Sequence, residues 1–281
     1  MTEPRVANID VATIEGFGDE WTAFNQEPLD PTEHKRMFDD YFELFPLNEL
    51  SAGEGFDLGC GSGRWAALMA PCVAKLHCID PSSKALDVSR LRLRGLVNVE
   101  FHLAGAHEIP LPDESQDFGY SLGVLHHIPD TELALRNCVA KLRRGAPFLL
   151  YLYYRFDNRP IWFRALWKVS DLGRHVVSRL PFRVRRLVAE IIAASIYYPV
   201  SRTARLAERL GVNVSNWPLS HYRSFGYYTM RTDALDRFGT RLEKRFLQPE
   251  IEAMMHRSGL VDVQFREAPP YWIAVGRRKA N

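Results

Sequence analysis

The chain has 281 residues, enough for one large domain or two small ones, and 46% of them are hydrophobic, which suffices for a packed core. Its 36 lysines and arginines nearly balance its 34 aspartates and glutamates, so the net charge of +2 does not indicate a nucleic-acid-binding protein. The four cysteines form no CxxC pair and have no histidine at metal-ligand spacing, so we expect no zinc site and no disulfide framework. Residues 1–19 lack the pattern of a signal peptide and no apolar run could span a bilayer, so the expectation is a soluble, cytoplasmic protein.

The predicted elements begin with a helix from Pro31 to about Phe45, because proline favours the first turn of a helix. From Gly55 onward, strand and helix signals alternate. The expected strands are 55–60, 74–80, 98–104, 117–125 and 146–154, and the expected helices are 62–72, 81–93 and 130–142. This alternation predicts an α/β fold with parallel strands and helices on both faces, since parallel strands need crossover connections.

The alternation stops after the fifth strand. Residues 155–245 form long amphipathic segments rich in arginine and aromatic residues, which predict an inserted and mostly helical lobe. A helix ended by Gly259 then precedes two strands joined at Pro269-Pro270, so we expect the sheet to resume there. The expected parts are an N-terminal helical cap (1–50), a core (51–154), the helical lobe (155–246) and a C-terminal completion of the core sheet (247–281).

A glycine-rich loop ends the first expected strand, in the stretch EGFDLGCGSGRWAALMA. Gly59, Gly61 and Gly63 stand at alternate positions, as is needed where backbone turns tightly and approaches a ligand. Such a loop offers backbone N–H groups to a polar ligand at the carboxyl ends of the strands. Asp80 ends the second strand beside it, where its carboxylate can accept two ribose hydroxyls, so a nucleoside-containing cofactor is indicated. The alternative is a tight turn without a ligand, with Asp80 as a helix cap.

The spacing of the glycines argues against a dinucleotide. The dinucleotide fingerprint is G-x-G-x-x-G, whereas Gly59 opens the sequence G-C-G-S-G. Asp57, two residues before Gly59, would repel a pyrophosphate and attract a cationic ligand. The loop therefore favours a positively charged nucleoside over a nicotinamide cofactor.

Four motifs in order, DLGCGSG, CIDPS, IPLPDESQDFGYSLGVLHHIPD and EIEAMMHRSGLVDVQF, resemble those of the class I S-adenosylmethionine-dependent methyltransferases, in the methyltransferase type 11-like family. The resemblance covers about Gly55 to Tyr151 and Gln248 to Gly276. It implies a doubly wound, Rossmann-like sheet of seven strands whose last strand is antiparallel. It also implies S-adenosyl-L-methionine as the cofactor.

Carried over position by position, the resemblance assigns cofactor contacts around the glycine loop. Asp57 is expected near the methionine amino group, and Asp80 is expected at the ribose diol, with Pro81 near the adenine. Close backbone approach is expected at Gly59, Cys60 and Gly61.

The remaining cofactor positions lie in three other segments. The segment LAGAHEIPLP resembles the adenine-proximal loop, but Gly105 stands where many members have an aspartate that takes the adenine amino group. This departure leaves the adenine edge to backbone atoms or another side chain, and Ala106 and His107 are expected to line it. Leu122 is expected under the methionine part. Trp21, in FGDEW, resembles a residue of an N-terminal segment that folds over the cofactor as a cap.

His126 and His127 are the catalytic candidates. Either imidazole could take a proton from a substrate hydroxyl or amine, because it titrates near neutrality. Either could instead bond a backbone carbonyl at the strand end. Methyl transfer depends mainly on aligning a nucleophile with the sulfonium methyl, so no base is obligatory.

The inserted lobe has three interpretations. It is a lid whose arginines bind a phosphate or carboxylate of the substrate, a basic surface for peripheral membrane contact near a lipid-linked substrate, or an ordinary helical lobe. Polar and aromatic side chains of the kind that line pockets gather in one segment, although turn and loop chemistry also explains them. The substrate contacts expected there are His221, Tyr222, Arg223, Tyr227 and Tyr228.

Together these patterns predict an S-adenosylmethionine-dependent methyltransferase that acts on a small molecule or biosynthetic intermediate. Anionic and lipid-linked compounds are the candidate substrates. No nucleic-acid substrate is expected, since the Asn-Pro-Pro-Tyr motif is missing, and no metal is expected, since no catechol-type carboxylate cluster is present. One alternative is a catalytically silent protein that binds S-adenosylmethionine or S-adenosylhomocysteine, which the departure at Gly105 favours. The other is an NAD-dependent oxidoreductase on the same sheet.

Overall fold

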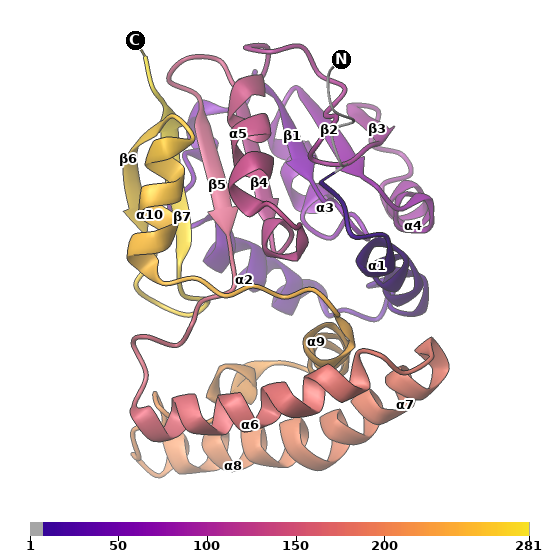
Figure 1. Cartoon of the computed structure of the whole chain (residues 1–281), viewed down its shortest axis with the longest axis vertical. Coiled ribbons are helices and arrows are strands. Elements are labelled where there is room, and N and C mark those ends of the chain that lie inside the picture. The colour runs from indigo at the N-terminus through magenta and orange to yellow at the C-terminus, as the bar shows by residue number, and fades with distance from the viewer. Residues whose placement is uncertain (1–7, 281) are drawn as a thin grey trace, which may run out of the picture. The chain divides into compact units, whose positions relative to one another are not determined.

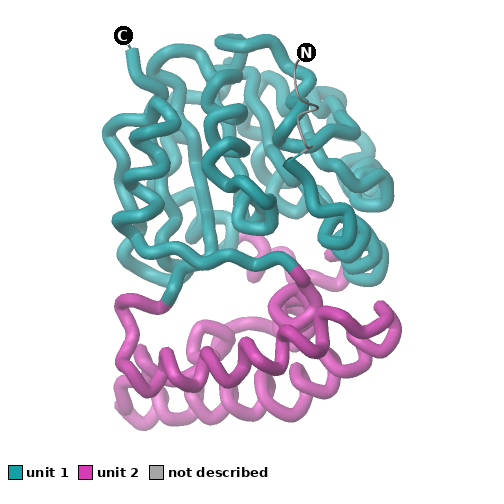
Figure 2. The backbone as a smooth tube through the Cα atoms, in the orientation of Figure 1, with its two compact units in different colours: residues 1–25, 36–155, 242–281 teal, residues 26–35, 156–241 magenta. Residues whose placement is uncertain are grey.

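The computed structural model describes residues 8–280 and divides the chain into two compact units (Figure 2). Unit 1 comprises residues 1–25, 36–155 and 242–281, and unit 2 comprises residues 26–35 and 156–241. The chain therefore leaves unit 1 after its fifth strand and returns before its last helix. Residues 26–35 also belong to unit 2, although the sequence predicts them as part of the N-terminal cap.

Among the described residues, seven strands form one sheet in unit 1, in the order β3-β2-β1-β4-β5-β7-β6 (Figure 1). β1 to β5 pair in parallel, whereas β7 is antiparallel to both β5 and β6. The predicted fold, a doubly wound sheet of seven strands with an antiparallel last strand, is confirmed. The strands are β1 (Glu54–Leu58), β2 (Lys75–Asp80), β3 (Val99–Leu103), β4 (Phe118–Leu122), β5 (Pro147–Tyr151), β6 (Leu260–Phe265) and β7 (Ile273–Arg278).

Two helices of unit 1 begin just after an aspartate whose side chain caps the first turn. Asp10 accepts a hydrogen bond from the N–H of Thr13 at 2.8 Å, and Asp130 accepts one from the N–H of Leu133 at 2.9 Å, so each satisfies an N–H group that the first helical turn leaves open. The helices are α1 (Val11–Ala23), α2 (Pro31–Phe42, whose first residues belong to unit 2), α3 (Ala66–Met69), α4 (Ser83–Arg92), α5 (Thr131–Lys141) and α10 (Gln248–Arg257).

The two faces of the sheet carry different helices. On one face, which we call the α5 face, the hydrophobic core joins Phe56 of β1 to side chains of α5 and α10. On the opposite face, which we call the α2 face, Tyr120 of β4 packs edge-on against Phe42 of α2, with ring centroids 5.3 Å apart. Asp57 pairs in register with Tyr120. Since side chains alternate along a strand, Asp57 also lies on the α2 face.

The helix expected at 62–72 is shorter than predicted. α3 covers Ala66–Met69 and is followed by a 3-10 turn over Ala70–Cys72. Gly63 has a φ of +73°, so the backbone before α3 is not helical, and Pro71 lacks the N–H that a longer α-helix requires. The helix that begins at Pro31 likewise ends at Phe42 rather than at Phe45.

Unit 2 is helical over its described residues, with α6 (Ile161–Val177), α7 (Phe182–Ile192), a π turn (Ala193–Tyr197), α8 (Tyr198–Arg209) and α9 (Tyr227–Gly239). Two arginines that the sequence places on a basic surface are buried instead. Arg174 donates to the carbonyl of Thr240 at 3.0 Å, and Arg185 donates to the carbonyl of Gly239 at 2.9 Å. They bind the carbonyl end of α9, where the helix dipole favours a cation.

Over residues 8–280, no helix combines the length and the apolar character needed to cross a membrane.

Candidate functional site

The expected cofactor residues of unit 1 come from four neighbouring strands of the sheet. Asp57 lies in β1, Asp80 ends β2, Ala106 and His107 follow β3, and Leu122 ends β4. These strands are parallel, so their carboxyl ends meet at one edge of the sheet, which is where ligands bind in this class of fold.

The glycine loop adopts a backbone that side-chain-bearing residues avoid. Gly59, Gly61 and Gly63 have φ values of +79°, +54° and +73°. At Gly61 a Cβ atom would lie 2.8 Å from Nε1 of Trp21, so the indole of α1 packs directly on the loop. The sequence predicts Trp21 as part of a cap over the cofactor, and the structure brings it to the loop that is expected to hold the cofactor.

Asp80 fastens this loop to the end of β2. One carboxylate oxygen accepts a hydrogen bond from the N–H of Gly61 at 2.9 Å, and the other accepts one from the N–H of Ser82 at 2.9 Å. Ser82, rather than Asp80, is the N-cap of α4, so the helix-cap interpretation of Asp80 is wrong. Burial raises the pKa of Asp80 to about 6, while the hydrogen bonds from Ser82 and Gly61 oppose the shift. At neutral pH the carboxylate is therefore ionised and each oxygen keeps lone pairs for a further donor.

Asp57 is a buried carboxyl group with an open hydrogen-bonding position. Its side chain is only 1% exposed, and among the described residues its Oδ2 has no hydrogen-bond partner. Burial raises its pKa to about 8; the nearby Tyr120 hydroxyl, which does not reach hydrogen-bond geometry, opposes the shift, and the charge of Asp80 adds to it. Such a group costs free energy unless a ligand supplies the missing donor.

These two acids fit the group that the sequence predicts. A cationic amino group near Asp57 would satisfy its open oxygen and favour the ionised carboxylate. A ribose hydroxyl near Asp80 would find an acceptor already ionised and already oriented by two N–H groups. The roles themselves stay predictions.

The loop after β3 places a histidine where the expected aspartate is missing. A Cβ atom on Gly105 would lie 2.8 Å from Nδ1 of His107, so the imidazole fills the space that a longer residue at position 105 would occupy. Asn137 of α5 donates to the carbonyl of Ala106 at 2.8 Å and holds the loop in place. His107 therefore lies beside the position of the absent aspartate, and its contact with the adenine stays a prediction.

The structure distinguishes the two catalytic candidates. His126 is fully buried and stacks on Tyr153 with ring centroids 4.0 Å apart, and burial holds its pKa well below the ordinary value, with the charges of His127 and Arg245 adding to the effect. His127 Nδ1 lies 2.6 Å from the carbonyl oxygen of Leu242, which can only accept, so Nδ1 carries the proton. When the His127 ring is neutral, its lone pair is therefore on Nε2, which is the form that a general base requires.

The sequence analysis missed an aromatic cluster at the end of β5. Tyr151 packs edge-on against Tyr41, with ring centroids 5.2 Å apart. Tyr41 also packs on Trp65, which follows the glycine loop, with ring centroids 4.7 Å apart. Tyr153 stacks on His126. The alternation in APFLLYLYY shows that Tyr151 and Tyr153 share one face, but no sequence signal links them to Tyr41 or to the histidines.

The expected substrate residues all lie in unit 2 and take part in its packing. His221 contacts Phe225 at 4.8 Å, and Tyr222 contacts Tyr197 at 5.3 Å. The other three make these contacts: Arg223 binds Glu208 at 2.9 Å, Tyr227 contacts Tyr198 at 5.9 Å, and the Tyr228 hydroxyl accepts from the N–H of Gln26 at 2.9 Å. Their role in substrate binding stays a prediction.

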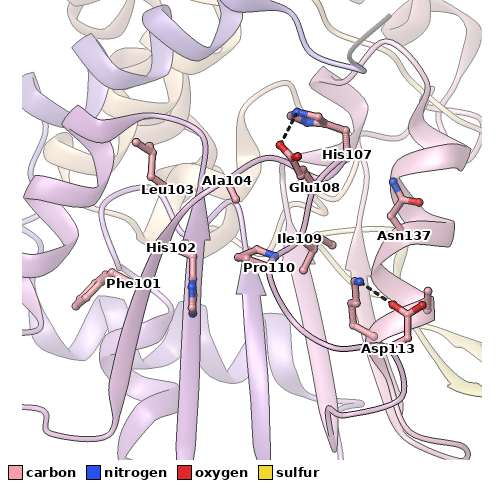
Figure 3. A pocket seen from close by; sticks show the side chains of 12 residues that line it. Phe101, His102, Leu103, Ala104, His107, Glu108, Ile109, Pro110, Asp113 and Asn137 are labelled. Carbon is pink, nitrogen blue, oxygen red and sulfur yellow. Dashed lines mark hydrogen bonds and ion pairs between the residues drawn. The ribbon is translucent and has the colours of Figure 1, made fainter. Parts of the chain in front are cut away.

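A groove of about 770 Å³ opens on unit 1 beside β3, as Figure 3 shows. His102 of β3, His107 of the following loop and Asn137 of α5 line it. Of the expected cofactor residues, only His107 borders this groove.

Part of unit 1 is similar to a known protein family. Residues 56–150 match a family described as a methyltransferase domain. This part of the chain, about a third of its length, is therefore similar to methyltransferase domains, in agreement with the predicted resemblance to the class I S-adenosylmethionine-dependent enzymes. The match agrees with the predicted enzyme class and with S-adenosylmethionine as its cofactor.

Relatives of the methyltransferase domain differ in how much of their length they share with this chain. An O-methyltransferase from Pyrenophora dematioidea is 30% identical over 43% of this chain and 48% of its own length, so this chain spans about half of that relative. A ubiquinone biosynthesis O-methyltransferase from Aromatoleum aromaticum is 29% identical over 68% of this chain and 86% of its own length. The structure of an O-methyltransferase family protein from Burkholderia thailandensis shares the fold, with 14% identity, a TM-score of 0.53, and coverage of 97% of this chain and 61% of that one.

Replacing Asp57 should separate stability from cofactor binding. An aspartate pKa of about 8 in the folded protein, above its ordinary value, means that folding is destabilised as pH rises from about 4 to 8. We expect Asp57→Asn to unfold at an equal or higher temperature at pH 7.5, yet to bind S-adenosylhomocysteine about 10- to 100-fold more weakly, because the bond to the ligand's amino group loses its charge.

The measurements are thermal unfolding without ligand and calorimetric titration with S-adenosylhomocysteine. Asp87→Asn, an exposed acid of α4 that loses the same charge, is the control and should leave the affinity unchanged. Wild-type affinity in Asp57→Asn would show that this carboxylate does not contact the cofactor.

Proposed function

We propose that this protein transfers a methyl group from S-adenosylmethionine to a hydroxyl oxygen of a small molecule. The observation that carries the proposal is the open Oδ2 of buried Asp57 beside the glycine loop, since it matches a ligand that brings a cationic amino group. The choice of oxygen as acceptor is supported by the relatives from Pyrenophora and Aromatoleum, both named as O-methyltransferases.

Different residues of this chain would have different roles in such a transfer. S-adenosylmethionine, when bound, supplies a methyl group activated by its positively charged sulfur. Asp57, Asp80 and the N–H groups of the glycine loop would hold and orient it. Water would be kept out by the aromatic cluster at the end of β5, so alignment in a dry site can supply most of the rate.

His127 is the group that would accept the proton of the acceptor hydroxyl. Its Nδ1–H is held by the carbonyl of Leu242, and its lone pair therefore sits on Nε2. His126, whose pKa is held low by burial, is better suited to pack against Tyr153 than to take up a proton. We therefore assign the base role to His127 alone.

The surface of unit 2 supports the proposal that the acceptor molecule resides in a membrane. Its helices expose an unusual number of large apolar side chains, at helical spacing along α6, α7 and α8. On α6 they are Ile161, Trp162, Leu166, Val169, Leu172 and Val176; on α7 they are Val184, Leu187 and Ile191; on α8 they are Tyr198 and Leu206.

Exposed cations accompany this apolar surface. They are Arg164, Lys168, Arg179, Arg183, Arg205 and Arg209, and Glu208 is the exposed acid among the described residues of α6 to α8. Apolar side chains that enter the headgroup region, flanked by arginine and lysine, are the pattern of a helix surface that lies on an anionic bilayer. A lipid-linked acceptor would be reached from such a surface.

A second candidate function is a silent protein that binds the cofactor without transfer. Gly105, at the position where the family resemblance implies an adenine-binding aspartate, is the observation that favours it. Binding of S-adenosylhomocysteine with no transfer to any acceptor would support this candidate over the enzyme.

Methyl transfer can be tested without knowing the natural substrate. We expect the wild-type protein to pass label from methyl-labelled S-adenosylmethionine to phenols or catechols, and more readily to those that carry a hydrocarbon tail. His127→Gln should lower kcat about 10²- to 10⁴-fold, because proton removal is lost, and should leave the affinity for S-adenosylhomocysteine unchanged. Equal kcat in wild type and variant would remove His127 from the reaction.

Membrane contact can be tested by sedimentation with lipid vesicles. We expect the wild-type protein to bind vesicles that contain phosphatidylglycerol, to ignore vesicles of phosphatidylcholine alone, and to be released by salt, because the attraction to arginines is screened. Leu166→Asp with Val169→Asp should abolish binding. Leu91→Asp with Val97→Asp changes two exposed apolar residues of unit 1 and should leave binding unchanged. Binding that survives the unit 2 substitutions would contradict the proposal.

A further inference from the structure

Three potential metal ligands meet on the α5 face of the sheet, near its β3 edge. His77 comes from β2, and Glu100 and His102 come from β3. His77 pairs in register with Glu100, and Ile79 pairs with His102, so all three side chains leave the same face of the sheet. Asp80 points to the other face, because it stands an odd number of residues from His77.

The donor atoms of these side chains form a compact triangle. His77 Nδ1 lies 2.8 Å from His102 Nε2, and Glu100 approaches both rings, with Oε2 at 3.7 Å from His77 Nδ1 and Oε1 at 3.7 Å from His102 Nε2. Donors bound to Zn²⁺ at about 2.0–2.2 Å in tetrahedral geometry are separated by roughly 3.3–3.5 Å. The triangle therefore fits such an ion after shifts of a few tenths of an ångström.

We propose that His77, Glu100 and His102 bind a divalent transition-metal ion, with Zn²⁺ as the ion that suits two imidazoles and one carboxylate. This site is new with respect to the sequence analysis, which expects no metal. The histidines are 25 positions apart in the chain, and only the pairing of β2 with β3 brings them together.

A second carboxylate fixes the orientation of the buried ligand. His77 Nε2 lies 2.7 Å from Oε1 of Glu54, the first residue of the neighbouring strand β1. A carboxylate only accepts, so Nε2 carries the proton and the neutral ring presents its lone pair on Nδ1, toward the other ligands. Metal-binding histidines commonly have this arrangement, in which the second ring nitrogen donates to a carboxylate.

The same contacts explain how the cluster is held without an ion. With His77 Nδ1 as acceptor, the N–H of His102 Nε2 must point at it, and this proton would have to move to Nδ1 of His102 when Nε2 binds a metal. Lys75 Nζ lies 2.8 Å from Glu100 Oε2 and neutralises it. Because the Lys75 side chain is 40% exposed, it can turn into water and yield its place.

The groove beside β3 borders one of the three proposed ligands. His102 lines this groove, and Figure 3 shows its ring beside the strand that forms the groove wall. A water molecule or a small ligand from the groove can occupy the fourth coordination position, which three protein ligands leave open.

The position in the sheet separates this site from the cofactor edge. Glu54 and Lys75 are the first residues of β1 and β2, whereas the glycine loop and Asp80 lie at the carboxyl ends of the same strands. An ion here would join the outermost strand β3 to β2 and thereby stabilise the edge of the sheet. The site does not depend on the proposed methyl transfer.

The test uses untagged, metal-free protein of full length, titrated calorimetrically with Zn²⁺, with Co²⁺ as a spectroscopic probe of coordination. We expect one ion per chain in wild type and the visible absorption bands of tetrahedral Co²⁺. Loss of a group that only orients a ligand weakens metal binding about 10- to 100-fold, so loss of a ligand should cost at least as much. His102→Gln should therefore raise the Kd for Zn²⁺ by at least that factor.

Glu100→Gln is a second variant, at an exposed position where folding is not at risk, and it should weaken Zn²⁺ binding in the same direction. His256→Gln, an exposed histidine of α10, is the matched control and should bind as wild type does. Absence of Zn²⁺ binding to wild type would overturn the proposal. So would an affinity for Zn²⁺ that stays unchanged in both His102→Gln and Glu100→Gln.

Discussion

The hydrogen bonds of Asp80 are the constraint on which the site depends. Its carboxylate holds the N–H of Gly61 and the N–H of Ser82, so one side chain joins the loop after β1 to the start of α4. The loop can follow this path because glycine tolerates its positive φ values, and Trp21 can pack on it because Gly61 has no side chain. The same carboxylate that shapes the loop is thus the one expected to meet the ribose.

The site places acidic groups where the fold alone would not favour them. Asp57 and Asp80 are both buried on the α2 face, and burial raises the pKa of each. Asp80 is compensated by two N–H groups, whereas Asp57 keeps an oxygen without a hydrogen-bond partner among the described residues. An unsatisfied buried group of this kind is typical of a binding site, where stability is lost in the free protein and regained with the ligand.

Much of the fold and part of the site can be predicted from the sequence. Alternating strand and helix signals predict the sheet, and the positions of Asp57, Asp80 and the glycines predict an edge where they meet, because parallel strands end together. The burial of Arg174 and Arg185 could not be predicted, since their partners are main-chain carbonyls of residues more than fifty positions away. The contact of His127 with the carbonyl of Leu242 could not be predicted for the same reason. The triangle of His77, Glu100 and His102 could not be predicted because it depends on the register between β2 and β3.

Calorimetric titration of S-adenosylmethionine and S-adenosylhomocysteine into wild type and Asp80→Ala tests the central claim most directly, namely that this edge of the sheet binds the cofactor through Asp80. The account predicts binding of micromolar order to wild type, with no binding of NAD, and loss of binding in a variant whose circular dichroism stays that of the folded protein. Binding of equal strength in Asp80→Ala, or no binding of either compound to wild type, would contradict it.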